Sequence, residues 1–329
     1  MKILNAQETR QALPMRESIA AMKAAYAALS SGRAEIPLRT ALPIAPEEAT
    51  SLFMPAFVEN AAGENALTIK IVHLFPQNPA RGLDFIQAAV MVFDAQSGKT
   101  LALLEGSTLT AIRTGAASGA ATDLLARPDS REVAIFGAGA QGRTQLEAVC
   151  TVREIEKVWI VDMDKNRAQA FVDEMSGYGP IPADIRIAPD PKTALANADI
   201  VCTATTSANP VYDAADLRPG THINGVGSYT LDMVENPPEM VLGASVFIDE
   251  HQAILAEAGE IVKAIRELGF AEEGMTELGK LVLGTASGRQ SEEEITFFKS
   301  VGVAVQDAMA AQLALKNAEG FDIGTEVDF

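Results

Sequence analysis

The spacing of apolar residues changes along the chain and divides it into three blocks. In the first block, residues 1–115, Met15–Ser30 predicts a helix, because residues such as Ile19 and Met22 recur at helical spacing. Three alternating stretches predict strands: Leu67–His73, Gln87–Asp94 and Thr100–Leu104. The sequence DAQSGK between the last two strands is typical of a hairpin turn. The first block therefore combines a helix with several strands.

The second block, residues 119–300, alternates short apolar runs with helical stretches. The runs predict strands at Glu132–Phe136, Lys157–Val161, Ile185–Ala188, Ile200–Ala204, Thr221–Val226 and Val246–Ile248. The helical stretches are Gln141–Thr151, Lys165–Met175 and Pro191–Ala196. This alternation predicts an α/β fold with a parallel, doubly wound sheet. The third block is a predicted helix near Phe298–Asn317, whose apolar faces suit packing against the first block.

Length and composition narrow the class of protein. A chain of 329 residues suits two domains, and apolar residues make up 48% of it with only 5% aromatics, so an aliphatic core is expected. The net charge of −18 argues against binding to nucleic acid or to an anionic membrane. Cys150 and Cys202 form no metal or redox pair and predict buried thiols. The N-terminus does not fit a signal peptide, and no apolar run could span a bilayer, so we expect a soluble, cytoplasmic protein.

A glycine-rich stretch, VAIFGAGAQG, lies between the first strand and first helix of the second block. Gly137, Gly139 and Gly142 have the G-x-G-x-x-G spacing that binds dinucleotides in this context. The next strand ends at Asp162, 25 residues after Gly137, where a carboxylate can bind the ribose hydroxyl of NAD. Because no arginine immediately follows Asp162, the sequence favours NAD(H), with NADP(H) possible. A glycine turn without a ligand is the alternative.

Basic residues in the first block are placed where solvent is a poor partner. Arg39 lies in PLRT, Lys70 inside the apolar strand TIKIV, and Arg113 among small residues. Buried cations need a partner, so each of these either meets a protein carboxylate or joins the others to bind an anionic ligand. Arginine holds a carboxylate with two parallel hydrogen bonds. Taken singly, each cation is better explained by a structural ion pair.

Other kinds of catalytic site find little support. The three histidines, His73, His222 and His251, have no metal-ligand spacing, so no metal is expected. No G-x-S-x-G nucleophile motif is present. The stretch HINGVGSYTLDM places Gly225 and Gly227 at a strand end, with Tyr229 where an acid might be expected for proton transfer.

Taken together, the sequence resembles the ornithine cyclodeaminase/μ-crystallin family. The matching stretches, in order, are FMPAF, LTIKIV, GSTLTAIRTGAASGAATDLLARPDS, IFGAGAQG, TATTSANPV, HINGVGS and GRQSEEEITFFKSVGVAVQD. The resemblance implies a Rossmann NAD(P)-binding domain at 119–302, inserted in a smaller α+β domain made of 1–118 and 303–329. That smaller domain is expected to bind substrate and to form a homodimer.

The resemblance also assigns roles to residues. Arg39, Lys70 and Arg113 are expected to hold the substrate carboxylate, with Leu52 and Met54 lining the same pocket. The cofactor is expected to contact Thr114, Gly137, Ala138, Gly139, Ala140, Gln141, Gly142, Asp162, Thr203, Thr205, Val226 and Gly227. The catalytic candidates are Lys70, Arg113 and Tyr229: the two cations position the substrate, and Lys70 or Tyr229 donates a proton. A packing role for Tyr229 is equally compatible with the sequence.

Two positions depart from the cyclodeaminases of the family. Those enzymes carry an aspartate where this chain has Tyr229 and a glutamate where it has Leu52. Both acids bind amines, and a second substrate ammonium without a partner would be costly to bury. We therefore expect a reductase of cyclic ketimine carboxylates that forms L-proline or L-pipecolate. The alternatives are an ornithine cyclodeaminase, an alanine dehydrogenase and a non-enzymatic binding protein of the crystallin type.

Overall fold

The computed structural model describes residues 1–59 and 65–328. The chain divides into two compact units: unit 1 is Met1–Arg113 with Val303–Phe329, and unit 2 is Thr114–Gly302. The first boundary lies five residues before the expected one, at Arg113/Thr114 rather than 118/119, within helix α3 (Gly106–Leu125). No helix among the described residues is both long and apolar enough to cross a membrane.

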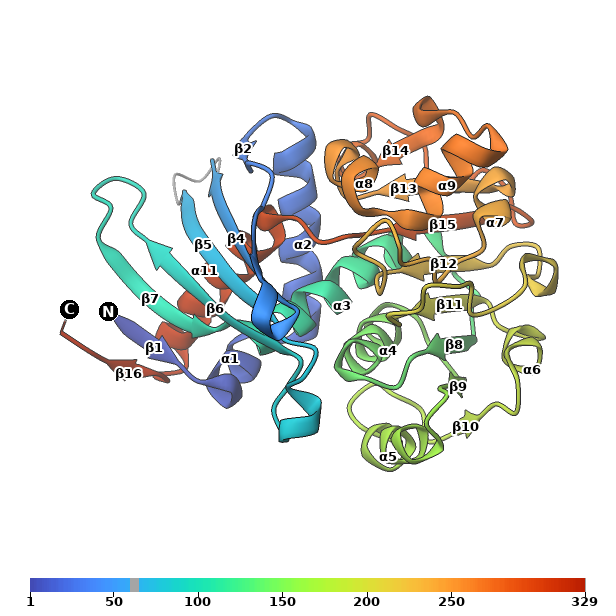
Figure 1. Ribbon diagram of the computed structural model, residues 1–329, viewed down its shortest axis with the longest axis horizontal. Helices are drawn as coiled ribbons and strands as arrows, with labels where there is room; N and C mark the ends of the chain where they lie inside the picture. Colours follow the sequence, from blue (N-terminus) through green and yellow to red (C-terminus); the bar gives the residue numbers. More distant parts are fainter. Residues whose placement is uncertain (60–64, 329) are drawn as a thin grey trace. The chain divides into compact units, whose positions relative to one another are not determined.

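Unit 1 is a mixed sheet covered by helices (Figure 1). Its strands are β1 (Lys2–Leu4), β2 (Ala34–Glu35), β3 (Thr40–Ile44), β4 (Ala49–Val58), β5 (Ala66–Leu74), β6 (Ile86–Phe93), β7 (Thr100–Glu105) and β16 (Thr325–Glu326). Its helices are α1 (Ala6–Ala12), α2 (Met15–Ser30) and α11 (Ala304–Gly320), with short 3-10 turns at Ala45–Glu47 and Pro79–Arg81. The strand order is β16-β1-β7-β6-β5-β4-β2, and β3 pairs with β4.

Leu52, Met54 and Lys70, which the sequence assigned to the substrate pocket, lie on one face of this sheet. Strands β4 and β5 are antiparallel, with Met54 opposite Lys70 and Leu52 opposite Val72. Because side chains alternate along a strand, these four lie on the same face. Helix α11 contacts β4, β5 and β6, and it also packs on α2, as expected for the last block of the sequence. Lys70 therefore lies on the sheet face that α11 covers.

Unit 2 is built on a parallel sheet. Its strands are β8 (Glu132–Phe136), β9 (Lys157–Val161), β10 (Ile185–Ile187), β11 (Ile200–Thr203), β12 (His222–Gly225), β13 (Ala244–Ile248), β14 (Met275–Glu277) and β15 (Ile295–Lys299). Its helices are α4 (Ala140–Val152), α5 (Lys165–Met175), α6 (Pro191–Leu195), α7 (Pro238–Gly243), α8 (His251–Glu257), α9 (Gly259–Leu268) and α10 (Leu278–Val282). The 3-10 turns are Ala214–Asp216 and Glu272–Gly274.

The strand order β10-β9-β8-β11-β12-β15-β13-β14, with all of these pairs parallel, is that of a doubly wound sheet. Figure 1 shows α4 and α5 on one side of β8 and β11 and α6 on the other. The direction of winding reverses between β8 and β11, and ligands of such sheets bind at the carboxyl ends of the strands at this point. The predicted fold class is confirmed.

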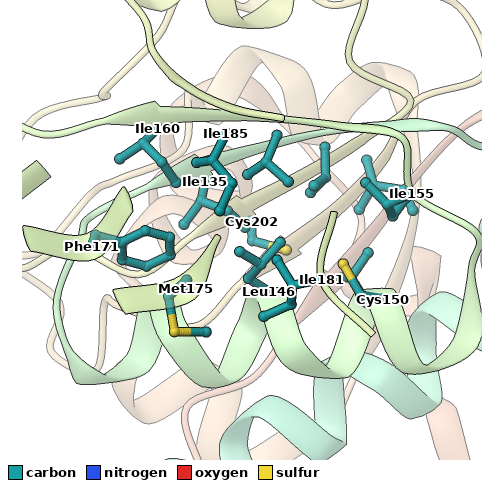
Figure 2. Packing of buried hydrophobic residues seen from close by; sticks show 14 of the residues in the cluster. Ile135, Leu146, Cys150, Ile155, Ile160, Phe171, Met175, Ile181, Ile185 and Cys202 are labelled. Atoms are coloured by element: carbon teal, nitrogen blue, oxygen red, sulfur yellow. The ribbon is translucent and has the colours of Figure 1, made fainter. Parts of the chain in front are cut away.

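The core of unit 2 is aliphatic, as the composition suggested. Figure 2 shows side chains of the sheet and of α4 and α5 packed together, among them Ile135, Leu146 and Phe171. Both cysteines belong to this cluster and are free thiols, with Cys150 7% exposed and Cys202 fully buried. Burial raises the pKa of both thiols, that of Cys202 to about 12.

The helix predicted near Phe298–Asn317 is wrong at its start. Phe298 belongs to strand β15, which lies between β12 and β13, and α11 begins only at Ala304. Gly302, at φ +84°, makes the turn between them. A buried parallel strand is apolar on both faces, so its sequence does not differ in period from a buried helix.

Candidate functional site

The three glycines of the glycine-rich loop in unit 2 have different structural surroundings. Gly137, at φ +101°, is left-handed, and a Cβ there would lie 2.6 Å from the carbonyl oxygen of Ala204. A Cβ at Gly142 would overlap the carbonyl oxygen of Gly137, so α4 could not approach the loop as closely. A Cβ at Gly139 would meet nothing within 4 Å, and its backbone is extended. The packing of the described residues therefore does not account for a glycine at position 139.

The amino end of α4 fits a bound pyrophosphate. Gly139 is the N-cap and offers no side chain to the first helical amides, which follow at Ala140 and Gln141. Such amides and the helix dipole attract phosphate oxygens. Arg143 donates to the carbonyl oxygens of Ala138 (2.6 Å) and Gly139 (3.2 Å) and so holds the loop in place. The buried side-chain oxygen of Gln141 has no hydrogen-bond partner among the described residues.

Asp162 lies at the end of β9, next to this loop. It accepts hydrogen bonds from the amides of Ala138 and Asp164, each at 2.8 Å, and from the guanidinium of Arg167. Burial opposes the charge of the carboxylate, but these hydrogen bonds outweigh it and hold its pKa below the usual value. The carboxylate is therefore ionised and fixed beside the loop, where a ribose is expected in this fold.

The strand-end loops after β11 and β12 are joined by a residue that the sequence did not single out. Glu235 is fully buried and accepts hydrogen bonds from the amides of Gly227 (2.5 Å) and Ser228 (3.2 Å). Its other oxygen accepts from the amide (2.8 Å) and hydroxyl (3.1 Å) of Thr205. Thr203 donates to Asn236, the next residue along the chain. The wall expected beside the nicotinamide is thus held by a buried carboxylate.

Close neighbours in the same loops explain the glycines in HINGVGS. A Cβ at Gly225 would lie 2.7 Å from the side-chain amide nitrogen of Asn236, and one at Gly227 would overlap the backbone of Thr205. Packing within unit 2 alone therefore requires both glycines. Val226 and Tyr229 lie half-buried in the same loop. Their expected contacts with cofactor and substrate stay predictions.

A second buried network holds the loop after β12 at Ser228. Lys299 and Glu260, both fully buried, form an ion pair at 3.1 Å. Ser228 donates to both oxygens of Glu260, and Lys299 donates to the carbonyl oxygen of Ser228 at 2.8 Å. Lysine in the apolar run ITFFK was the available signal, because a buried cation requires a partner.

The cations of unit 1 converge on a carboxylate. The Nζ atom of Lys70 lies 2.7 Å from Asp307 Oδ2, and the Nε atom of Arg113 donates to Asp307 Oδ1 at 3.0 Å. Lys70 is 2% exposed, Arg113 5% and Asp307 1%, so solvent does not compensate these charges. The structure therefore brings together two of the three predicted cations, and it gives each the ion-pair partner that burial requires.

Gln306 and Tyr26 complete this cluster and were missed by the sequence reasoning. Arg113 Nη1 donates to the side-chain oxygen of Gln306 at 2.6 Å, and the Gln306 amide donates to the hydroxyl of Tyr26 at 2.6 Å. Gln306 and Asp307 stand at the start of α11, as the polar pair in GVAVQDAMAA. The guanidinium of Arg113 is thereby fixed in orientation.

Arg39 acts on the same cluster through its charge. Burial, together with the positive charges of Arg113 and Arg39, lowers the pKa of Lys70 to about 7, against the opposing effect of Asp307. Arg39 is partly exposed and precedes β3. Lys70 and Arg113 thus share the carboxylate of Asp307, and two cations on one anion leave an excess of positive charge.

The surroundings of these cations are apolar. Leu52 is 8% exposed and Met54 3%, and both lie on the sheet face that carries Lys70. Thr114, the first residue of unit 2, is buried, and its carbonyl oxygen accepts from the side-chain amide of Gln145 at 3.3 Å. The contacts of these residues with any ligand stay predictions.

Comparison with known proteins finds a family and relatives that match almost the whole chain. The model of the ornithine cyclodeaminase/mu-crystallin family matches residues 1–321. A Δ1-pyrroline-2-carboxylate reductase from Bacillus cereus is 39% identical over 100% of both chains. The structure of Thermococcus litoralis Δ1-pyrroline-2-carboxylate reductase with NADH and L-proline has a TM-score of 0.94 and 38% identity, covering 99% of this chain and 100% of that one.

An archaeal alanine dehydrogenase dimer with bound NAD is also similar, with a TM-score of 0.91 and 30% identity over 100% of this chain and 99% of that one. The family model covers both units from their first residues to α11. The stretches that carry the glycine-rich loop and the buried cations lie within this match. The chain belongs to the ornithine cyclodeaminase/μ-crystallin family.

Proposed function

We propose that this protein reduces a cyclic ketimine carboxylate, Δ1-pyrroline-2-carboxylate or Δ1-piperideine-2-carboxylate, to L-proline or L-pipecolate with NADH. The observation that carries the proposal is the buried cluster of Lys70, Arg113 and Asp307 with its excess of positive charge. A substrate carboxylate supplies the missing negative charge. Its planar oxygens match the fork of Arg113, which Gln306 and Asp307 hold in one orientation.

Hydride addition to C2 of the protonated imine reduces the C=N bond and gives the neutral amine, which then takes up one further proton, while NADH becomes NAD⁺. When bound, the dihydronicotinamide supplies the hydride. Arg113 and Lys70 bind the carboxylate and so fix the position of the neighbouring C=N carbon, which accounts for much of the rate in such reactions. Lys70 holds a proton on Nζ, and its pKa in the protein without substrate is lowered to about 7. It is our candidate proton donor, with Tyr229 as the alternative.

The residues beside Lys70 favour a cyclic imine over a diamine. Leu52 and Met54 present apolar side chains on the face of Lys70. An ornithine side chain would bring its ammonium against these apolar side chains, whereas the methylenes of a ring lose nothing by burial there. The names of the Bacillus cereus and Thermococcus litoralis relatives support the same substrate class.

The nucleotide site supports NADH. Gly137, Gly139 and Gly142 form the loop, and Asp162 stands ionised where the ribose hydroxyls are expected. NAD or NADH is bound in the two solved relatives described above. NADPH is the alternative cofactor.

A single panel of assays tests the proposal. Oxidation of NADH and of NADPH is followed with both cyclic imines, with pyruvate plus ammonia, and in reverse with ornithine and NAD⁺. We expect turnover of a cyclic imine that falls at least about a hundredfold in Arg113→Lys, which keeps the charge but loses the fork. Turnover of pyruvate plus ammonia alone would instead identify an alanine dehydrogenase, as the archaeal relative suggests.

Position 52 provides a second test of substrate class. Leu52→Glu restores the acid that the cyclodeaminases carry, and it is expected to reduce imine turnover by about tenfold or more, since it adds a buried negative charge. Leu52→Met is the matched control and should stay within about threefold, because the two side chains have similar volumes. Equal losses in the two variants would show that Leu52 contributes packing alone.

We also propose a homodimer in the cytoplasm. The alanine dehydrogenase relative is a dimer, and both cysteines of this chain are free thiols, as is usual in reducing compartments.

A further inference from the structure

Arg167 lies in the first turn of α5 and pairs with Asp162 in a two-point contact. Its Nε donates to Oδ2 at 3.0 Å and its Nη2 donates to Oδ1 at 2.7 Å. The side chain of Arg167 is 54% exposed, whereas that of Asp162 is 4% exposed. No arginine immediately follows Asp162 in the sequence, but the structure brings one to it from five residues further on.

The carboxylate of Asp162 is already saturated with donors. Besides Arg167, the Ala138 amide bonds Oδ2 and the Asp164 amide bonds Oδ1, each at 2.8 Å. A carboxylate accepts about four hydrogen bonds, so a ribose hydroxyl can bind Asp162 only if one of these donors leaves. The two amides belong to the backbone of the loop and the strand end, and Arg167 is the exposed, flexible donor. Nucleotide binding is thus expected to release Arg167.

The released guanidinium is placed to bind a phosphate group. It stays within reach of the same edge of the site, where a 2′-phosphate stands in place of the 2′-hydroxyl. Arg143, the other arginine near the loop, is committed to Glu174 (2.7 Å) and to the carbonyl oxygens of Ala138 and Gly139. Arg167 also offsets the charge of Asp162, which would otherwise repel a phosphate strongly.

We propose that Arg167 sets the nucleotide preference of this protein: it leaves Asp162 to bind the 2′-phosphate of NADPH, and it thereby allows both NADH and NADPH to bind. This inference rests on the proposed function, because it concerns the same nucleotide site. Asp162 without its arginine would give a site restricted to NADH.

Binding of NADH, NADPH and 2′,5′-ADP to the substrate-free protein tests the proposal, measured by nucleotide fluorescence and by competition. Arg167→Gln is expected to weaken NADPH and 2′,5′-ADP by about tenfold and to leave NADH binding equal or tighter, because NADH no longer has to displace the arginine from Asp162. Arg186→Gln is the matched control, because Arg186 is 53% exposed and forms a similar two-point pair with Asp184 on the surface. It should change neither nucleotide.

A second variant tests the other half of the pair. Asp162→Asn keeps the shape of the side chain and removes its charge, so NADPH should bind more tightly and NADH more weakly. Equal effects of Arg167→Gln on NADH and NADPH, or no effect on either, would overturn the role of Arg167 and leave the proposed reductase intact. A wild-type protein that binds neither nucleotide would overturn the proposed function itself.

Discussion

Lys70 carries its charge in surroundings that oppose it. Burial and two neighbouring arginines lower its pKa to about 7. The cluster of Lys70, Arg113 and Asp307 therefore loses one of its positive charges near cellular pH. Binding of an anion favours the charged lysine and raises its pKa, and a proton is taken up with the ligand above that pH. In the proposed reductase, Lys70 would therefore make carboxylate binding depend on pH.

The first prediction follows from this linkage. Pyrrole-2-carboxylate is a planar analogue whose own charge does not change between pH 6 and 9, and its dissociation constant should be flat below about pH 7 and rise above it. Asp307→Asn removes the charge that opposes deprotonation, so the rise should start at lower pH. Lys316→Met, an exposed change on the same helix, should leave the profile in place. A profile that is identical in wild type and Asp307→Asn contradicts the assignment to Lys70.

At the scale of elements, the glycine-rich loop separates packing from binding. Gly142→Ala should destabilise unit 2, because the added Cβ overlaps a backbone oxygen that cannot easily move. Gly139→Ala should leave the melting temperature within about 2 °C, since its Cβ meets nothing and its backbone is extended, yet it should weaken NADH binding by about tenfold or more. Calorimetry and fluorescence titration of the two variants provide the check. Unchanged NADH binding in Gly139→Ala would mean that the open space is not the cofactor site.

The strand-end loops of β11 and β12 give a further prediction. Glu235→Gln leaves some of the donors of Gly227, Ser228 and Thr205 buried without an acceptor, at a cost of about 2–4 kcal/mol in the free energy of unfolding. Glu239→Gln, on the exposed side of the neighbouring helix α7, should change it by less than about 0.5 kcal/mol. Urea unfolding measures both. Similar midpoints for the two variants would show that Glu235 does not hold the loops together.

The sequence allowed prediction of elements whose signals are local. Strands β8 and β9 and helices α2 and α5 have the expected bounds to within one residue, because each is a run of one period with a clear stop. Strand β4 was not predicted, since Pro55 and the polar Thr50 and Ser51 interrupt its pattern. Asp307 was not predicted as the partner of Lys70, because only tertiary packing brings residues 70 and 307 together.

At the scale of the whole molecule, the net charge of −18 contrasts with the cationic cluster of unit 1. The cluster is a local exception, and in the proposed reductase it would attract a small anion without making the surface attractive to polyanions. The proposed homodimer is tested by light scattering during gel filtration, with an expected mass of twice 34.7 kDa. A mass of 34.7 kDa at micromolar concentration would argue against a stable dimer.

The buried thiols give this protein an internal reporter. Cys150 and Cys202 are its only cysteines, and both lie in the core of unit 2, so a thiol reagent such as Ellman's reagent reacts only when that unit opens. Labelling should be slow in the native protein and should slow further with NADH, in proportion to how far the nucleotide concentration exceeds its dissociation constant. Rapid labelling that NADH does not retard would contradict this expectation. When NADH does slow the reaction, the rate of colour development measures cofactor affinity in the absence of any substrate, and no reporter residue has to be engineered into the protein.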